Sequence, residues 1–407
     1  MTDDLDLTAA GLDALQQRLR TAQYHNLGFP GATDIDHGPI DPGWWNLLLN
    51  NVGDPEIDGL GGNHTKGFER AVVRFVADVL RAPDGCWGYI TSGASEGTLY
   101  ALFLARRRFP TGIVYHSIAA HPSVAKAATI VGLDTVVVRA QAGGEIDYQD
   151  LATMVGQRRD RPAIVVATAG TTFTEAVDDL RQIRAVLDSL ALTRRYVHVD
   201  AALAGIPLGL LSPNTRPGFD LEDGADSIVL SGHKFLGAPM PCGVLVTRTR
   251  PDPAADQRPA GYTGSPDTTL LGSRNGHTAL ILAHTIHTLG RDGLQARALQ
   301  ARTVADYAVA RLSRIRWLAW RHPHAFTVVI RQPPLQVRQR WVLVSDGADN
   351  AHIVCMPGIT TGQIDEFVAD LHTALTPKRP DLPPSTQDGR RPAADVPAQR
   401  SPAEATT

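Results

Sequence analysis

The 407-residue chain has few cysteines, no long uninterrupted apolar run and no large excess of either charge. Its three cysteines, Cys86, Cys242 and Cys355, are far apart and odd in number, which excludes a disulfide framework or CxxC metal motif and predicts buried free thiols. No stretch approaches the roughly 18 apolar residues of a membrane span, and the acidic N-terminus lacks the basic and then apolar pattern of a signal peptide. We therefore expect a cytoplasmic protein with no membrane partner.

The near balance of charge limits the kinds of partner. A formal net charge of -3 provides no electrostatic surface for nucleic acid or anionic lipid. With 43% hydrophobic and 20% charged residues, the composition is that of a folded globular protein, and the length suffices for a large core plus a smaller domain. We therefore expect a small-molecule partner and no nucleic-acid partner.

Short apolar, largely β-branched runs alternate with segments of helical periodicity along most of the chain. The strand-like runs are 86–90, 112–115, 135–138, 163–167, 196–199, 226–230 and 242–247. Helical periodicity marks 68–80, 98–107, 123–131, 148–156, 177–190 and 279–289. This alternation predicts an α/β fold with a mostly parallel central sheet that helices cover on both faces.

The pattern changes near residue 290, where we expect a boundary between a large and a small domain. Beyond it, a helix at 304–312 and two strands, at 326–330 and 352–355, predict a smaller C-terminal α+β domain. The predicted division is an N-terminal arm, 1–60, a large domain, 61–289, the small domain, 290–375, and a proline-rich tail, 376–407. The tail has no apolar periodicity and is expected to be disordered, because it cannot bury enough surface to order itself.

Three strand-like runs end at polar or glycine-bearing positions, and ligands of open α/β sheets bind at such carboxyl ends. One run ends at Asp200, and a later one ends at Ser231-Gly232-His233-Lys234. A lysine framed by small and hydroxyl residues, with an acid ending an earlier strand, is what a pyridoxal phosphate (PLP) enzyme requires: Lys234 forms the Schiff base and Asp200 keeps the pyridine nitrogen protonated. If each residue is considered alone, Lys234 is interpreted as a surface lysine in a turn and Asp200 as a helix N-cap. The convergence of three strand ends at one site favours the cofactor interpretation.

A run of small residues, 91–97, lies between the strand at 86–90 and the helix at 98–107. Small residues at such a turn let backbone N–H groups approach a phosphate at the helix N-terminus, where the helix dipole favours an anion. The alternative is a helix that Ser92 or Ser95 simply caps, and the presence of the lysine favours the phosphate. The glycine-rich segment 59–67 is not expected to be a phosphate loop, because no buried strand precedes it and no Ser or Thr follows its lysine.

Together these segments resemble the group II PLP-dependent amino-acid decarboxylases, most closely the branch of bacterial histidine decarboxylases and plant serine decarboxylases. The resemblance covers about residues 20–372. It rests on the segments 50–55, 65–69, 91–97, 170–172, 177–179, 198–203, 231–234, 239–244 and 272–277. It implies the aspartate-aminotransferase-like fold of PLP-dependent transferases (fold type I), with PLP as cofactor, and a homodimer or higher homo-oligomer whose active site lies at the subunit boundary.

The resemblance also implies roles for individual residues. Lys234 would carry the cofactor covalently, Asp200 would contact the pyridine nitrogen, and His121 would stack on the ring and contact the substrate. Ala202 would pack on the opposite face of the ring, and Thr172 would lie near the cofactor. The phosphate would be held by Ser92, Gly93, Ala94, Ser231 and His233. Without the resemblance, His121 would be interpreted as a core or helix-entry histidine.

The sequence departs from the family pattern at several positions, some of them near the expected substrate side. The departures are Gly61, His64, Thr98, Pro122 and Glu175, where tyrosine, asparagine, asparagine, tyrosine and glycine, respectively, are usual. They leave the cofactor chemistry intact and bear on which amino-acid side chain is accepted.

Several histidines invite a metal interpretation: His116, His121, His284, His287, His322 and His324. A metal site needs a convergent third and fourth ligand whose orientation is fixed by further hydrogen bonds, and nothing at suitable spacing supplies them. We expect no metal.

The function that these observations predict is PLP-dependent decarboxylation of an L-amino acid, with L-histidine, giving histamine and CO2, as the first candidate. The alternatives are decarboxylation of L-serine or another polar amino acid, and a PLP-dependent lyase or decarboxylative oxidase on the same scaffold. A non-catalytic scaffold is the least favoured interpretation, because Lys234 and Asp200 are both present.

Overall fold

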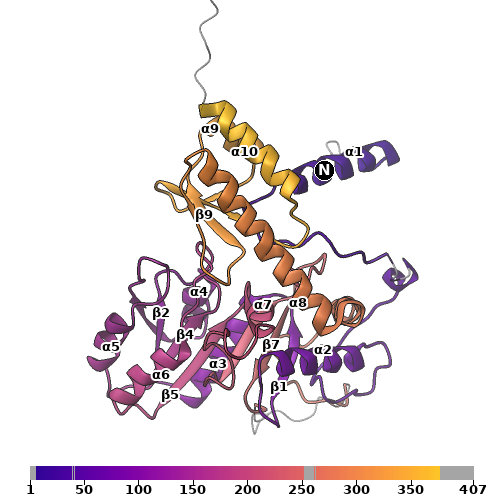
Figure 1. Cartoon of the computed structure of the whole chain (residues 1–407). Coiled ribbons are helices and arrows are strands. Elements are labelled where there is room, and N and C mark those ends of the chain that lie inside the picture. The colour runs from indigo at the N-terminus through magenta and orange to yellow at the C-terminus, as the bar shows by residue number, and fades with distance from the viewer. Residues whose placement is uncertain (1–5, 39, 41, 252–260, 262, 376–407) are drawn as a thin grey trace, which may run out of the picture.

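The computed structural model describes residues 6–38, 40, 42–251, 261 and 263–375. The tail predicted to be disordered, 376–407, lies outside the described residues. The described chain contains a seven-stranded sheet and a four-stranded sheet, and the long helix α8 (Gly276–Arg314) runs from the first to the second (Figure 1).

The seven-stranded sheet has the order β1-β7-β6-β5-β4-β2-β3, and β7 is antiparallel to both of its neighbours while the other pairs are parallel. Its strands are β1 (Trp87–Thr91), β2 (Ile113–Ser117), β3 (Asp134–Val138), β4 (Ala163–Thr168), β5 (Arg195–Asp200), β6 (Ser227–Ser231) and β7 (Gly243–Thr247). Every residue of β1, β2, β4, β6 and β7 is buried, as expected for strands that have helices on both faces. The predicted α/β fold with a mostly parallel sheet is confirmed.

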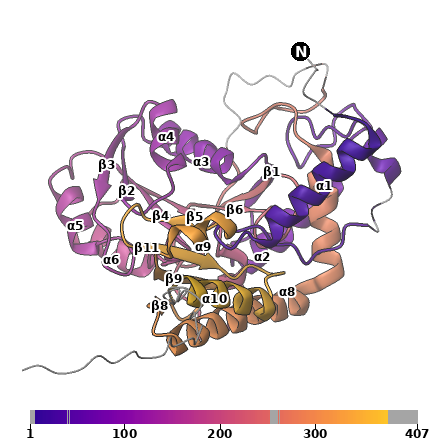
Figure 2. The same ribbon diagram turned by 90° about the horizontal axis from the view of Figure 1, so that it is seen from above.

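Helices cover both faces of this sheet (Figures 1 and 2). They are α2 (Lys66–Val79), α3 (Ala94–Arg108), α4 (Ser123–Ile130), α5 (Tyr148–Gly156), α6 (Leu180–Ser189) and α7 (Gly205–Gly209). Successive β4 residues face opposite layers: Ile164 packs in the cluster that contains Leu102 of α3, and Val165 packs in the main core cluster together with Ile183 of α6. Each fully buried side chain of this size contributes about 1.5–3 kcal/mol of transfer free energy.

The four-stranded sheet is antiparallel, in the order β10-β11-β9-β8. After α8, its region contains β8 (Ala319–Trp320), β9 (Thr327–Arg331), α9 (Leu335–Arg340), β10 (Val344–Ser345), β11 (Asn350–Val354) and α10 (Thr361–Leu375). Gly290 interrupts α8 with φ 59° and ψ -172°, a conformation that glycine adopts at little cost, and the helix bends there. The bend falls where the sequence predicts a domain boundary, and that division remains a prediction.

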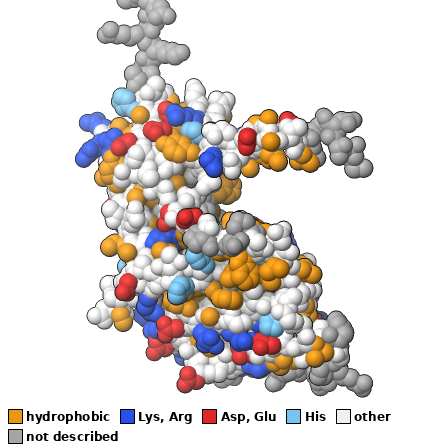
Figure 3. Space-filling view, turned by 90° about the vertical axis from the view of Figure 1, so that its right-hand side faces the viewer, with side chains coloured by type: hydrophobic (Ala, Val, Ile, Leu, Met, Phe, Trp, Pro, Cys, Tyr) orange, Lys and Arg blue, Asp and Glu red, His pale blue; other side chains and the backbone are white. Residues whose placement is uncertain are grey.

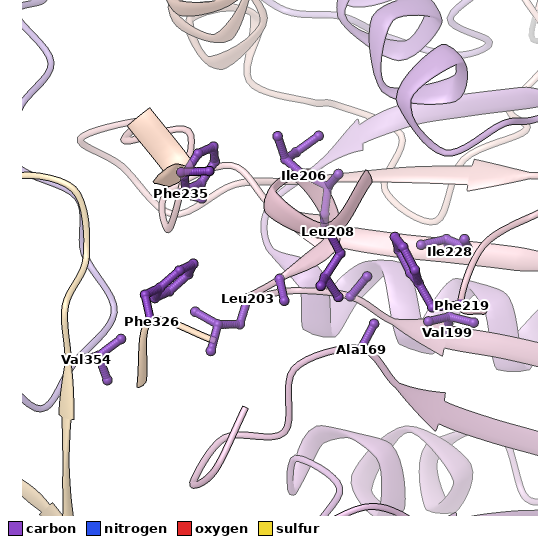
Figure 4. Close-up of a cluster of buried hydrophobic side chains, with 14 of the residues drawn as sticks. Ala169, Val199, Leu203, Ile206, Leu208, Phe219, Ile228, Phe235, Phe326 and Val354 are labelled. Atoms are coloured by element: carbon purple, nitrogen blue, oxygen red, sulfur yellow. The ribbon is translucent and has the colours of Figure 1, made fainter. Parts of the chain in front are cut away.

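The two sheets share one hydrophobic core, part of which Figure 4 shows. Phe326 and Val354 come from the small-sheet region, whereas Leu203 and Phe235 come from loops at the carboxyl edge of the large sheet. All four side chains are buried. This shared core fixes the small sheet against the edge of the large sheet at which β4, β5 and β6 end.

The N-terminal region combines a projecting helix with a segment that joins the small sheet. Helix α1 (Ala9–Tyr24) has no buried residue and stands away from the body (Figure 1). After it, Leu27 donates its N–H to Val342 O at 3.1 Å, and its own carbonyl accepts from Val354 N at 2.7 Å. A short 3-10 helix, η1 (Pro42–Asn46), follows. None of the described helices combines the length and apolar character needed to cross a membrane.

Candidate active site

A cavity of about 510 Å³ lies at the carboxyl ends of β4, β5 and β6, beside the N-terminus of α3. All ten residues that the sequence singles out for the cofactor line it: Ser92, Gly93, Ala94, His121, Thr172, Asp200, Ala202, Ser231, His233 and Lys234. They come from strand ends and loops spread over residues 92–234, and the sheet brings these segments to one edge.

Asp200 is the last residue of β5 and is buried. Its Oδ1 accepts the backbone N–H of Ala202 at 3.0 Å, so the turn after the strand fixes the carboxylate. Thr168, its partner across the parallel β4–β5 pair, also lines the cavity. The Oγ1 of Thr168 is buried and has no hydrogen-bond partner among the described residues, which indicates that a polar ligand group belongs here.

Lys234 lies in the turn that follows β6 and is half-buried. Burial lowers the pKa of its ammonium group, and the charge of Asp200 acts in the opposite direction. A lowered pKa increases the fraction of neutral amine, which is the form that attacks a carbonyl carbon. Gly232 permits this turn, because a Cβ at that position would lie 2.6 Å from the Sγ of Cys242.

His121 lies in the loop between β2 and α4. Its Nδ1 accepts the backbone N–H of Ser123 at 3.2 Å and lies 2.8 Å from the Ser123 hydroxyl, so the neutral ring carries its proton on Nε2. Burial lowers the pKa of His121; the charges of Lys234 and Lys126 also lower it, and Asp200 opposes them. The ring is therefore held in its neutral form.

The N-terminus of α3 forms the anion-binding end of the cavity. The first N–H groups of an α-helix have no partner within the helix and carry the positive end of its dipole. The backbone N–H of Ser92 donates to the Glu96 carboxylate at 2.7 Å, so Ser92 offers its exposed hydroxyl instead. Across the cavity, the Nδ1 of His233 contacts the backbone of Cys242, which fixes the ring orientation.

Another part of the cavity wall was not found by sequence reasoning. Gly28, Phe29 and Pro30 line it from the N-terminal segment, and Val344, His352 and Val354 line it from the small sheet. The Nδ1 of His352 lies 2.9 Å from Phe173 O, and its Nε2 lies 3.0 Å from Gly28 O. No local pattern marks these residues, because their shared position depends on contacts between distant segments.

These groups fit PLP. An acid for the pyridine nitrogen, an amine for the aldehyde carbon and a helix N-terminus for the phosphate line one cavity, and the unpartnered Thr168 hydroxyl agrees with a polar ligand. Among the described residues, no group of three or more His, Cys, Asp or Glu side chains lies close enough to hold a metal ion. The fold and the site together define a PLP-dependent enzyme of fold type I.

Comparison with known proteins identifies the family. The pyridoxal-dependent decarboxylase conserved domain matches residues 64–314. Over 362 residues the chain is 42% identical to a histidine decarboxylase of Mesorhizobium japonicum, covering 88% of this chain and 95% of that protein. It is 37% identical over 360 residues to serine decarboxylase 2 of Oryza sativa subsp. japonica, covering 87% of this chain and 76% of that protein.

Solved structures agree with this result. The L-methionine decarboxylase of Streptomyces sp. 590 superposes with a TM-score of 0.80 at 25% identity, covering 89% of this chain and 95% of that one. The chain therefore belongs to the pyridoxal-dependent decarboxylase family, and it is a PLP-dependent carboxy-lyase that acts on an amino acid. The predicted family, cofactor and reaction class are confirmed.

Proposed function

We propose that this enzyme converts L-histidine to histamine and CO2. The observation that carries the proposal is the 42% identity to a histidine decarboxylase over nearly the whole of both chains. Further histidine decarboxylases, from Vibrio campbellii and Pseudomonas entomophila, are 34% and 32% identical over similar lengths. Lys234, Asp200 and His121, the three residues to which we assign the reaction, line one cavity, which supports the proposal.

The roles of these residues follow from their surroundings. Lys234, whose lowered pKa favours the neutral amine, would hold the cofactor covalently between turnovers. Asp200 would keep a proton on the pyridine nitrogen, and the neutral imidazole of His121 would contact the cofactor without adding a second positive charge. When bound, PLP accepts the electrons of the Cα–carboxylate bond as CO2 leaves. The N-terminus of α3, with Ser92, Gly93 and Ala94, would hold the phosphate.

L-Serine is the second candidate substrate, because plant serine decarboxylases are almost as similar to this chain. The product of each candidate is distinct, so mass spectrometry of products from L-histidine, L-serine and L-methionine separates them. We expect histamine, with kcat/KM for L-histidine at least ~10-fold above that for the other two. Ethanolamine as the main product would favour L-serine. Loss of substrate without CO2 release would favour a PLP-dependent lyase.

We further propose that the enzyme is a cytoplasmic homodimer or higher homo-oligomer. Large apolar side chains are exposed along the segment 44–68, including Trp45 at 50%, Leu48 at 79% and Leu60 at 73%. Figure 3 shows a patch of hydrophobic side chains on one face of the molecule. Exposed apolar patches of this kind mark protein interfaces. Light scattering should show at least a dimer, which the double variant Trp45→Glu, Leu48→Glu should weaken. A fully active wild-type monomer would contradict the proposal.

A further inference from the structure

The loop Gly170–Ala176 connects β4 to the segment before α6, and its residue Thr172 lines the active-site cavity. The loop is closed on itself: the N–H groups of Gly170 and Thr171 both donate to Ala176 O, at 3.0 and 2.9 Å. The Thr171 hydroxyl also accepts the N–H of Ala176 at 3.0 Å. A loop closed in this way moves as one unit, so a contact at one end affects the position of Thr172.

Glu175, within this loop, has a backbone conformation that disfavours its side chain. Its φ is 58°, in the left-handed region that glycine adopts readily and that costs other residues free energy. A glutamate here needs a compensating interaction, and its side chain provides one.

The Glu175 carboxylate is buried and contacts the small sheet. Its Oε2 accepts the backbone N–H of Phe326 at 3.1 Å and that of Thr327, the first residue of β9, at 2.8 Å. Both donors come from the other side of the boundary between the two sheets. Burial raises the pKa of Glu175 to about 7, against the effect of these N–H donors and of the Arg302 charge.

A second contact joins the same loop to the small sheet. The carbonyl of Phe173 lies 2.9 Å from the Nδ1 of His352 in β11, and the two rings pack with centroids 5.2 Å apart. Phe173 and Glu175 both follow Thr172 closely. The small sheet therefore holds the loop at two points next to the residue that faces the cavity.

We propose that Glu175 is a positioning residue: its carboxylate fixes the loop Gly170–Ala176 to β9 and so holds Thr172 in place for the cofactor. The effect on the cofactor rests on the proposed use of the cavity. Glu175 does not line the cavity and acts only through the loop. Its loss should weaken cofactor binding more than it disturbs the fold.

The test uses three substitutions that separate the hydrogen bonds, the charge and the backbone conformation. Glu175→Gln keeps a carbonyl oxygen that can accept both N–H groups and removes the charge. Glu175→Ala removes the acceptor and keeps the unfavourable φ, whereas Glu175→Gly removes both. Ala191→Gly is the matched control, because Ala191 is exposed, has φ 52° and lies outside the cavity.

We expect the Ala and Gly variants to raise the Kd for PLP about tenfold, as for the loss of one or two hydrogen bonds, while Gln and the control stay within ~2-fold of wild type. Ala and Gly variants that bind PLP within ~2-fold of wild type would overturn the proposal. The proposal would also be overturned if the Kd for PLP changed in Glu175→Gly but not in Glu175→Ala. The backbone conformation at position 175, and not the carboxylate, would then account for the effect. If both fail to fold, Glu175→Asp, whose oxygen is withdrawn by one methylene, replaces them.

Hydrogen exchange on the cofactor-free chain tests the contact independently of the proposed function. The amides of Phe326 and Thr327 should exchange at least ~10-fold faster in Glu175→Ala than in wild type or Glu175→Gln. Unchanged exchange would overturn the contact itself. If exchange is faster in Glu175→Ala but the wild-type protein binds no PLP, the contact between Glu175 and β9 is supported. The proposed function is then refuted.

Discussion

Thr168 and Asp200 are partners across the parallel strands β4 and β5, and both line the same cavity. The backbone N–H of Ala202 donates to Asp200, whereas the buried hydroxyl of Thr168 has no partner within the described part of the chain. A fixed acid thus lies beside an unsatisfied hydroxyl. An unsatisfied buried hydroxyl costs about 1–3 kcal/mol, which a polar ligand would relieve.

Thr168→Val tests that interpretation. Valine has nearly the same shape and removes the unpaired hydroxyl, so the cofactor-free variant should be as stable as wild type or up to ~1 kcal/mol more stable. Its affinity for PLP should fall about tenfold if the hydroxyl contacts the cofactor. Thermal unfolding with and without PLP measures both effects. A variant with unchanged affinity would place the Thr168 hydroxyl outside the cofactor site.

Asp200→Asn should keep the fold and lose catalysis. The amide oxygen of asparagine can still accept the N–H of Ala202, so the turn after β5 should survive. A neutral amide cannot hold the pyridine nitrogen protonated, and we expect kcat to fall at least ~10²-fold. Circular dichroism and steady-state kinetics check the two expectations. Near-normal turnover would remove Asp200 from its proposed role.

The pH dependence of turnover should report the neutral ring of His121. Burial, together with Lys234 and Lys126, lowers the pKa of His121 below the ordinary value of 6.5. The ring therefore becomes protonated only at a pH below 6.5. We expect an acid limb of kcat below that value. His121→Phe should lose the limb and ~10²-fold of kcat while still binding PLP. Persistence of the same limb in the variant would assign it to another group.

Glu175→Gln should stabilise the enzyme most at neutral and higher pH. The folded state raises the pKa of Glu175 from 4.5 to about 7, so it favours the protonated carboxyl group. The stability that this protonated group provides is fully present below pH 4.5 and is lost as the pH rises through 7. The loss is on the order of 3 kcal/mol. In urea unfolding, the free energy of unfolding of Glu175→Gln should therefore rise relative to that of wild type between pH 5 and pH 8.

Asp178 provides the contrast to Glu175. Its pKa is also raised to about 7 by burial, but it uses both oxygens: Oδ1 accepts Ile146 N at 2.7 Å and Oδ2 accepts Thr168 N at 2.8 Å. Asparagine would point its NH2 group at one of these N–H groups. Asp178→Asn should therefore destabilise the fold where Glu175→Gln does not, and equal effects would contradict the description of the two carboxylates.

The cofactor side of the site could be predicted because its residues carry local signals. Asp200 ends an apolar strand and Lys234 stands in a turn of small residues, so strand periodicity alone brings both to one sheet edge. The small-sheet side could not be predicted in this way. His352 reaches the cavity because β11 pairs with β9 and hydrogen-bonds to Leu27, and contacts between such distant segments leave no periodic trace in the sequence.

The elements of the fold also differ in how well the sequence predicts them. Long buried strands such as β4 and β5 have the apolar runs that predict them, whereas the two-residue strands β8 and β10 are too short to show alternation. The helices expected at 279–289 and 304–312 correspond to the two arms of α8, which meet at the non-helical Gly290. The second arm begins earlier than predicted, because the sequence between Gly290 and Val304 shows weaker apolar periodicity than the segment after it.

The assignment of Lys234 is tested most directly by borohydride reduction of the PLP-loaded enzyme followed by peptide mass mapping. The chain has four lysines, Lys66, Lys126, Lys234 and Lys378, so the position of the cofactor adduct can be assigned without ambiguity. We expect one adduct, on Lys234, and none in Lys234→Ala, together with loss of turnover in that variant. Lys66 already donates to Ile57 O at 2.5 Å and should stay unmodified. A reduced adduct on Lys66 or Lys126, with Lys234 unmodified, would show that Lys234 does not carry the cofactor.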